Sequence, residues 1–198
     1  MKRLALILLI VLAAVWAVIS VIVELEGEYR FETLKGGAGK GRALVLFHPS
    51  RDAHFSDDLS LAFAEGLMAA GFDVDRATLT SETPARPEAY NLIAVVSNTY
   101  YWTPDLPTLR YLRRARLQGI AAAGLIGGAG STGRSQRVLD LALRGTGATV
   151  IETRSFWLWR PNDETRARES NREVALSLAR QFGTESANRV LAGTTPAP

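Results

Sequence analysis

Three short segments of the chain gather residue types that bind anions and flat ring systems. The first, residues 48–56, reads HPSRDAHFS and contains both histidines. The second, residues 97–105, reads SNTYYWTPD and sets hydroxyl and amide groups beside three consecutive aromatic side chains. The third, residues 127–134, reads GGAGSTGR, in which missing side chains let a ligand approach the backbone N–H groups. Hydroxyls and free N–H groups suit a phosphate, and aromatic faces suit a planar ring.

Histidines and carboxylates crowd the first segment and its continuation. They are His48, Asp52, His54, Asp57 and Asp58. Imidazole nitrogens with carboxylate oxygens could ligate a metal ion. Charged residues at this density in a loop are usually solvated, so we predict no metal site. The chain also contains no cysteine, which excludes disulfides, thiolate metal centres, iron–sulfur clusters and cysteine nucleophiles.

Hydrolytic chemistry is another interpretation of the same segment. Ser50, Asp52 and His54 have the residue types of a nucleophile, an orienting acid and a base. Residues so close in one loop rarely place the base within hydrogen-bond reach of the nucleophile while a third group orients it. The sequence also contains no Gly-x-Ser-x-Gly elbow. We therefore do not predict a serine hydrolase.

The elements that must position these segments follow an alternating pattern. Short apolar runs predict buried strands at residues 43–47, 72–79, 92–96, 120–126 and 149–155. Helical periodicity predicts helices at residues 59–70, 106–117, 135–143 and 163–182. We expect Ser56 to cap the first helix, and Gly71 and Gly183 to end the first and the last. Right-handed crossovers in such a chain bring all three segments together at the carboxyl ends of the strands.

Four stretches of sequence resemble the flavodoxin family and together cover most of residues 42–155. ALVLFHPSR resembles the first strand and the start of the phosphate loop, and FAEGLMAAGFDVDRATL resembles the helix and strand that follow. YNLIAVVSNTYYWTPDLPTLRYLRRA resembles the third strand with its aromatic loop. AAAGLIGGAGSTGRSQRVLDLALRGTGATVI resembles the fourth strand, its glycine-rich loop and the next helix. The resemblance implies an α/β fold with a doubly wound five-stranded parallel sheet of order 2-1-3-4-5.

Flavodoxins bind FMN, so the resemblance implies an FMN site on the same three segments. The phosphate would lie against hydroxyl and N–H groups at a helix start, and the isoalloxazine ring between the aromatic and glycine-rich loops. The implied cofactor-binding residues are Ser50, Arg51, His54, Ser97, Asn98, Thr99, Tyr100, Tyr101, Trp102, Gly128, Gly130, Ser131 and Gly133. Such a protein would exchange electrons or hydride equivalents with a membrane-associated partner, such as a quinone or another redox protein.

The first segment departs from the family's Ser/Thr-x-Thr-Gly-x-Thr loop. Ser50 matches, but Asp52, Ala53 and Phe55 replace a hydroxyl, a glycine and a threonine. Two aspartates in the first helical turn would repel a phosphate unless Arg51 compensates. These departures favour an alternative function, a flavin-free interaction module at the membrane. The sequence leaves open whether the chain is an FMN-dependent oxidoreductase.

An apolar run at the N-terminus predicts a membrane anchor. Residues 4–23 contain one polar residue, Ser20, and twenty residues at about 1.5 Å each can cross a hydrocarbon core of roughly 30 Å. A cleaved signal peptide is the alternative, but its apolar stretch is shorter and ends in a small-x-small site, whereas Glu24 follows valine here. We predict a single-pass membrane protein with residues 4–23 in the lipid bilayer. Basic residues flank both ends of the run, so the side that the domain occupies stays undetermined.

The composition divides the chain into an anchor and three further parts. After the transmembrane anchor at 1–23, we predict a linker at 24–41, the flavodoxin-like domain at 42–183 and a flexible tail at 184–198. The linker's GGAGKG lacks the first glycine and the final Ser/Thr of a Walker A loop. Apart from Lys2 and Arg3, 21 basic residues stand against 20 acidic ones, so we predict no nucleic-acid partner.

Two further features of the sequence have more than one interpretation. A basic run is formed by Arg110, Arg113, Arg114 and Arg116. It could be a solvated helix face or lie against anionic lipid headgroups. Trp157 and Trp159 could cover a pocket, pack under the last helix or touch a membrane surface.

Overall fold

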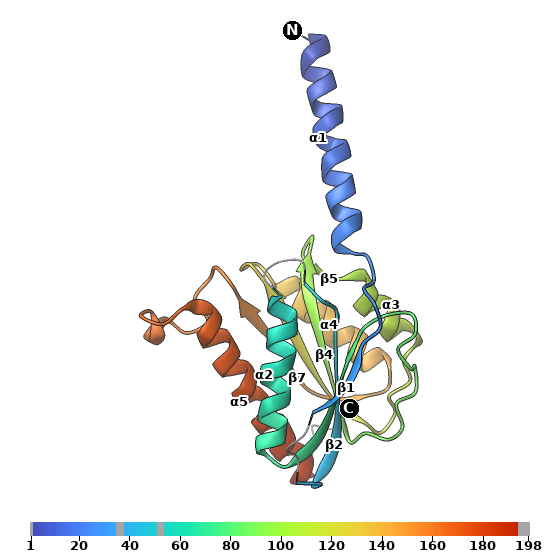
Figure 1. The fold of residues 1–198 in the computed structure, drawn as a ribbon, viewed down its shortest axis with the longest axis vertical. Helices are drawn as coiled ribbons and strands as arrows, with labels where there is room; N and C mark the ends of the chain where they lie inside the picture. The colour runs from blue at the N-terminus through green and yellow to red at the C-terminus, as the bar shows by residue number, and fades with distance from the viewer. Residues whose placement is uncertain (1, 35–37, 51–53, 194–198) are drawn as a thin grey trace.

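One mixed sheet organises the chain, in the order β1-β3-β2-β4-β6-β7 (Figure 1). The computed structural model describes residues 2–34, 38–50 and 54–193. The strands are β1 (Phe31–Leu34), β2 (Gly41–Phe47), β3 (Phe72–Thr78), β4 (Leu92–Tyr100), β5 (Thr103–Pro104), β6 (Ala121–Gly128) and β7 (Thr149–Trp157). The helices are α1 (Lys2–Val23), α2 (Phe55–Ala69), α3 (Leu106–Arg114), α4 (Gly133–Gly145) and α5 (Asn171–Leu191), with a 3₁₀ turn η1 (Glu164–Arg166).

The five predicted strands are present and run parallel, as β3-β2-β4-β6-β7. Numbered among themselves they have the order 2-1-3-4-5. The prediction of a purely parallel five-stranded sheet is wrong, however, because β1 pairs antiparallel with β3 and β5 pairs antiparallel with β4. The fold is therefore α/β with a mixed, mostly parallel sheet.

Strand β1 lies inside the stretch that the sequence predicted as a linker. Its charged side chains suggested a solvent-exposed segment, but a strand at the edge of a sheet has one side in water and tolerates such residues. Polar side chains of β1 also pair with side chains of the neighbouring strand β3. Thr33 Oγ1 donates to Asp75 Oδ1 at 2.6 Å, and the Arg76 guanidinium forms an ion pair with Glu32. The sheet therefore includes Phe31–Leu34, which lie inside the predicted linker at 24–41.

The two faces of the sheet bury separate apolar layers. In β2, Ala43, Val45 and Phe47 belong to one cluster, and Leu44 and Leu46 belong to the other. This alternation follows from the two-residue period of a strand. Helices α2 and α5 cover the first face, and α3 and α4 cover the second (Figure 1). Both faces are thus buried, which explains why the central strands read as continuous apolar runs.

The last helix departs from its predicted limits at both ends. It begins at a capping box, in which Ser170 Oγ accepts from the N–H of Glu173, whereas Asp163 caps η1 instead. It also continues through Gly183 to Leu191. Gly183 therefore lies inside the helix and does not end it. Its lack of a side chain allows the backbone of α2 at Phe63 to approach closely. The first eight residues of the predicted flexible tail are therefore helical.

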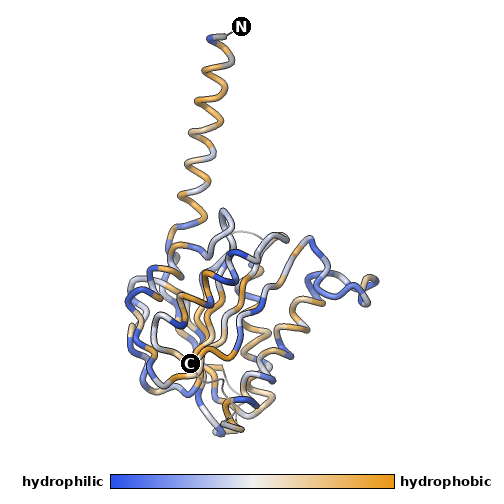
Figure 2. Tube along the Cα trace, turned by 180° about the vertical axis from the view of Figure 1, so that it is seen from behind, coloured by the Kyte–Doolittle hydropathy of each residue, from blue (hydrophilic) through white to orange (hydrophobic). Residues whose placement is uncertain are grey.

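Helix α1 projects from the domain and is apolar over most of its length (Figure 2). Residues Leu6–Val23 have a mean hydropathy of 3.2, and none of that window is buried. Within the described part of the chain it is the one helix long and apolar enough to cross a membrane, a property that signal sequences share. It leaves the domain at the edge where the parallel strands end (Figure 1).

Candidate functional site

The three predicted segments meet at the carboxyl ends of β2, β4 and β6. These strands are neighbours and parallel, so their ends share one edge of the sheet. Asn98 Nδ2 at the end of β4 donates to the carbonyl of His48 after β2 at 2.9 Å. A Cβ at Gly128, the last residue of β6, would lie 3.4 Å from Thr99 Oγ1. The predicted convergence of the segments is therefore present.

The first segment is closed by two serines that bond to each other. The Ser50 N–H donates to Ser56 Oγ at 2.8 Å, and the Ser56 N–H donates to Ser50 Oγ at 3.3 Å. Ser56 Oγ also donates to the His48 carbonyl at 2.7 Å. Ser56 is therefore not the N-cap of α2; that position is held by His54, which has φ 55° and no side-chain cap. Arg51, Asp52 and Ala53 lie outside the described residues.

The two aspartates in the first turn of α2 are neutralised by arginines from other elements. Asp57 pairs with the nearly buried Arg76 of β3, and Asp58 pairs with Arg172 of α5. The sequence suggested that these carboxylates would repel an anion at the helix start. Because each carries its own cation, that repulsion is largely offset.

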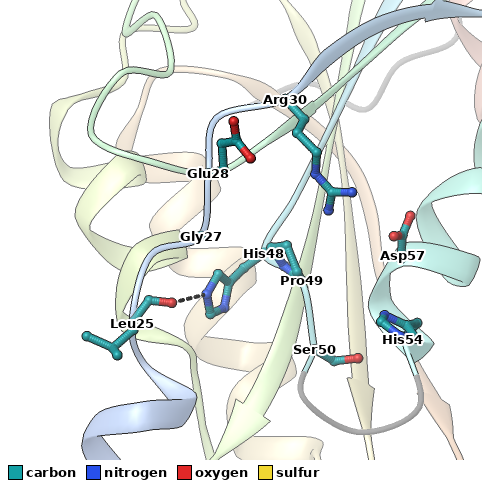
Figure 3. Close-up of a pocket in the computed structure, with 9 residues that line it drawn as sticks. All are labelled: Leu25, Gly27, Glu28, Arg30, His48, Pro49, Ser50, His54 and Asp57. Atoms are coloured by element: carbon teal, nitrogen blue, oxygen red, sulfur yellow. Dashed lines mark hydrogen bonds between the residues drawn. The ribbon is translucent and has the colours of Figure 1, made fainter.

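A cavity of about 550 Å³ lies beside the first segment (Figure 3). One wall comes from His48, Ser50, His54 and Asp57, and the other from residues 25–30, which precede β1. The side chain of Arg30 points into the space above Ser50 and His54 (Figure 3). The cavity therefore offers a guanidinium and an imidazole near the start of α2, where backbone N–H groups have no helical partner.

Asp105 is the most heavily bonded side chain of the site, and the sequence analysis assigned it no role. It is fully buried and caps α3 by accepting from the Thr108 N–H at 2.9 Å. It also accepts from Ser97 Oγ at 2.8 Å and from the Asn98 N–H at 2.7 Å. The signal was present in the sequence, because an aspartate before Leu-Pro is typical of a helix N-terminus. Ser97 and Asn98 thus hold Asp105.

His48 links Asp105 to the segment that follows α1. Its Nδ1 lies 3.5 Å from Asp105 Oδ1, too far for a good hydrogen bond but close enough for strong attraction between charges. Its Nε2 donates to the Leu25 carbonyl at 3.1 Å (Figure 3). Burial lowers the pKa of His48, but Asp105, the Leu25 carbonyl and Glu24 outweigh it and leave that pKa raised. Burial likewise raises the pKa of Asp105, but His48 and Thr108 outweigh it and leave that pKa lowered.

The aromatic side chains of the second segment diverge. Tyr101 and Trp102 form the tip of the β4–β5 hairpin, where they are 42% and 60% exposed. Tyr101 packs edge-on against Trp16 of α1 with ring centroids 5.1 Å apart, while Tyr100 is half-buried. Thr99 Oγ1 is buried and has no hydrogen-bond partner among the described residues.

The third segment is fastened to the chain after β7. The N–H groups of Leu158 and Trp159 donate to the carbonyls of Gly128 and Ala129 at 3.0 and 3.1 Å. Trp157 Nε1 donates to Thr132 Oγ1 at 2.7 Å, so this tryptophan packs on the loop. Trp159 is 80% exposed.

The other predicted residues of this segment have little around them. A Cβ at Gly130 would meet only Arg160 Cβ, at 3.5 Å, and one at Gly133 would meet nothing within 4 Å. Ser131 is exposed. Among the described residues, no group of three or more His, Asp or Glu side chains could hold a metal ion.

We compared the sequence and the fold with those of known proteins. No protein-family model matches the sequence, and no curated protein matches it. The fold matches a flavodoxin from the domain Archaea (16% identity, 75% of this chain and 98% of that one, TM-score 0.57). It also matches oxidised flavodoxin 1 from Bacillus cereus (16% identity, 74% and 97%, TM-score 0.57). A third match is an NAD(P)H:quinone oxidoreductase from Methanothermobacter marburgensis (20% identity, 74% and 98%, TM-score 0.54). The domain that follows α1 therefore has the flavodoxin-like fold.

Proposed function

We propose that this chain is a membrane-anchored, FMN-binding protein that exchanges electrons or hydride equivalents with a membrane-associated quinone or redox protein. The observation that carries the proposal is the meeting of three ligand-type segments at the carboxyl edge of a flavodoxin-like sheet, the place where open α/β sheets bind ligands. Bound FMN would supply the redox chemistry, and the protein would supply binding and orientation. Two of the structural neighbours, a flavodoxin and an NAD(P)H:quinone oxidoreductase, agree with this class of reaction.

The phosphate end of FMN would lie at the start of α2. The positive end of the helix dipole favours an anion there, and Arg30 and His54 line the adjoining cavity. The Asp57 carboxylate does not strongly repel a phosphate there, because it forms an ion pair with Arg76.

The ring end would lie between β4 and the third segment. Thr99 Oγ1 is buried and has no hydrogen-bond partner in the part of the chain that the structure describes, which costs about 1–3 kcal/mol and which a ligand atom could relieve. A Cβ at Gly130 would have one neighbour within 4 Å, Arg160 Cβ at 3.5 Å, so the backbone there is open to a flat ring on the remaining side. Of the three predicted aromatic residues, Tyr100 lines the cavity at the base of α1, Tyr101 packs on Trp16 and Trp102 is 60% exposed, so the ring contacts that we propose come from Thr99 and the third segment.

The test is a titration of the full-length protein in detergent with FMN, followed by flavin absorbance and fluorescence. We expect quenching that saturates. Gly130→Val should weaken FMN affinity at least about tenfold, because its branched side chain would fill the open space over the loop. Gly145→Ala, in α4 with no atom within 4 Å of the new Cβ, is the matched control and should bind FMN normally.

A specific observation favours the flavin-free interaction module as second candidate. The hydroxyls of Ser50 and Ser56 bond within the loop, and residues 25–30 line the cavity beside it, fixed there by the Leu25–His48 hydrogen bond. These two hydroxyls therefore already have partners within the protein. Wild-type protein that leaves flavin fluorescence unchanged at high FMN would reject the oxidoreductase proposal and favour this module.

The anchor belongs to the same proposal. An 18-residue window of hydropathy 3.2 with no buried share would expose a large apolar surface to water, and insertion into a bilayer removes that cost. We assign α1 to a single membrane span; the side on which the domain lies stays open.

A further inference from the structure

The tip of the β4–β5 hairpin has an unusual composition for its backbone. Tyr100 pairs with Thr103, so Tyr101 and Trp102 form a two-residue turn, with φ of 51° and 60°. Two successive left-handed residues define the turn that strongly prefers Asn-Gly or Gly-Gly. Bulky side chains are strained in this conformation. The chain therefore tolerates strain to place two aromatic side chains at the tip.

Little of that aromatic surface is used inside the domain. Trp102 is 60% exposed, and Leu106, four residues later in the sequence, is 41% exposed. Exposed aromatic residues at a strained turn indicate a role outside the fold.

The contacts of Tyr101 show where the tip lies. Its ring packs on Trp16, and its hydroxyl bonds to Ser20, the one polar residue of the apolar run. Trp16 lies seven residues before the end of α1, which corresponds to about 10 Å along the helix axis. The hairpin tip thus stands beside the last two turns of α1, and Figure 1 shows it pointing toward that helix.

We propose that the hairpin tip is a second membrane contact. Tyr101 and Trp102 enter the bilayer beside the last two turns of α1, and the carboxyl edge of the sheet faces the lipid. This inference rests on the membrane span proposed above, but not on FMN. It adds a second attachment beside α1 and so gives the domain a fixed orientation at the membrane.

The chemistry of the surface fits a bilayer interface. Tryptophan and tyrosine are enriched at headgroup level, where a ring with one polar atom is partly wet and partly in hydrocarbon. A largely apolar cavity of about 470 Å³ lies between the base of α1 and the hairpin, with Leu106 and Arg110 on its wall. Arg110 is placed to reach anionic headgroups, which is one of the two roles that its sequence suggested. A reactant dissolved in the membrane would meet the candidate site directly.

The test uses the absence of cysteine in the native chain. Single substitutions Val15→Cys, Trp102→Cys and Leu141→Cys are spin-labelled in the full-length protein, in vesicles of phosphatidylcholine and phosphatidylglycerol. Accessibility to oxygen, which concentrates in lipid, is compared with accessibility to a water-soluble nickel chelate. Val15 reports on α1, and Leu141, 68% exposed on α4, is the aqueous control. We expect labels at 15 and 102 to favour oxygen several-fold more than the label at 141.

The outcomes separate the two proposals. Oxygen access at 15 with chelate access at 102 would overturn the second contact and leave the anchor standing. Chelate access at both positions would overturn both the contact and the membrane span.

A second variant separates a membrane role from a structural one. Tyr101→Asn with Trp102→Gly restores a favoured turn, so the domain should unfold at a higher temperature than the wild type. A label at Leu106→Cys should lose its oxygen preference in that background and match the label at 141. Unfolding at a lower temperature, with the Leu106 label unchanged, would show that the aromatic residues serve the fold and not the membrane.

Discussion

Replacing Gly183 with alanine is expected to cost about 3 kcal/mol or more of folding free energy, at the upper end of the range for overpacked cores. A Cβ at Gly183 would lie 2.1 Å from the carbonyl oxygen of Phe63 in α2. On the facing helix, a Cβ at Gly66 would lie 1.9 Å from the carbonyl oxygen of Arg180. These obstacles are backbone atoms, which cannot rotate away as a side chain can. The two helices would have to separate, and the edge-on contact between Phe63 and Phe182 would be lost.

The measurement is urea or thermal unfolding of the full-length protein in one detergent. Gly66→Ala should behave like Gly183→Ala, because the two glycines form one reciprocal contact between α2 and α5. Gly145→Ala is the matched control, since nothing lies within 4 Å of its new Cβ and its φ is not positive. Helix propensity predicts that this control is neutral or gains up to about 1 kcal/mol. A Gly183→Ala protein as stable as the wild type would refute the close approach of the two helices.

Gly183 also shows where sequence reasoning reaches its limit. A glycine that ends a helix and a glycine that lets another helix approach look the same in the local sequence. The difference lies in a partner helix more than a hundred residues away, near Gly66. The five parallel strands were predictable for the opposite reason. Their signal is local, because burial on both faces makes each strand a continuous apolar run.

The edge strand β1 was missed because its side chains are charged and its pairing is not local. Glu32 and Thr33 find partners on β3, over forty residues later in the chain. Only the fold shows that these polar residues belong to the sheet.

The site was predictable as a place but only partly as a set of contacts. The alternation of strands and helices places residues 48–56, 97–105 and 127–134 at one edge, whatever their side chains do. Which hydroxyls remain for a ligand depends on geometry. Ser97 and Ser50 bond within the protein, whereas Thr99 Oγ1 lacks a partner among the described residues. All three are the same kind of group in the sequence.

Replacing Asp105 with alanine is expected to have an effect as large as that of Gly183, about 3–5 kcal/mol of folding free energy. The carboxylate is fully buried and accepts from Ser97, from the Asn98 N–H and from the Thr108 N–H. Its removal leaves these donors unsatisfied, uncaps α3 and leaves His48 without its counter-charge. Asp105→Asn keeps an acceptor for the cap and has nearly the same volume, so it should lose less and still fold. Urea unfolding of both variants at one pH measures the two losses, and an alanine variant that unfolds like the wild type would show that this network contributes little.

The asparagine variant also predicts a change in pH dependence. In the wild type the pKa of His48 is raised, so its stabilisation is complete below the ordinary value of about 6.5 and is lost as pH rises through the folded value. The pKa of Asp105 is lowered, so its contribution is present above about 3.9 and is lost only in stronger acid. Above pH 6.5 the pair should therefore weaken as His48 deprotonates.

With Asp105→Asn the largest influence on His48 is burial, which lowers its pKa, against weaker support from Leu25 and Glu24. A buried imidazole with a lowered pKa is neutral in the folded state and destabilises the protein as pH falls through about 6.5. The free energy of unfolding of the variant should then rise with pH up to about 6.5, whereas that of the wild type falls as pH rises above about 6.5. Comparing the two proteins at each pH cancels the groups that they share. Parallel curves for wild type and variant would show that His48 and Asp105 are not coupled, whereas curves that converge as pH rises would establish a charge pair that holds the chain leaving α1 against the candidate site.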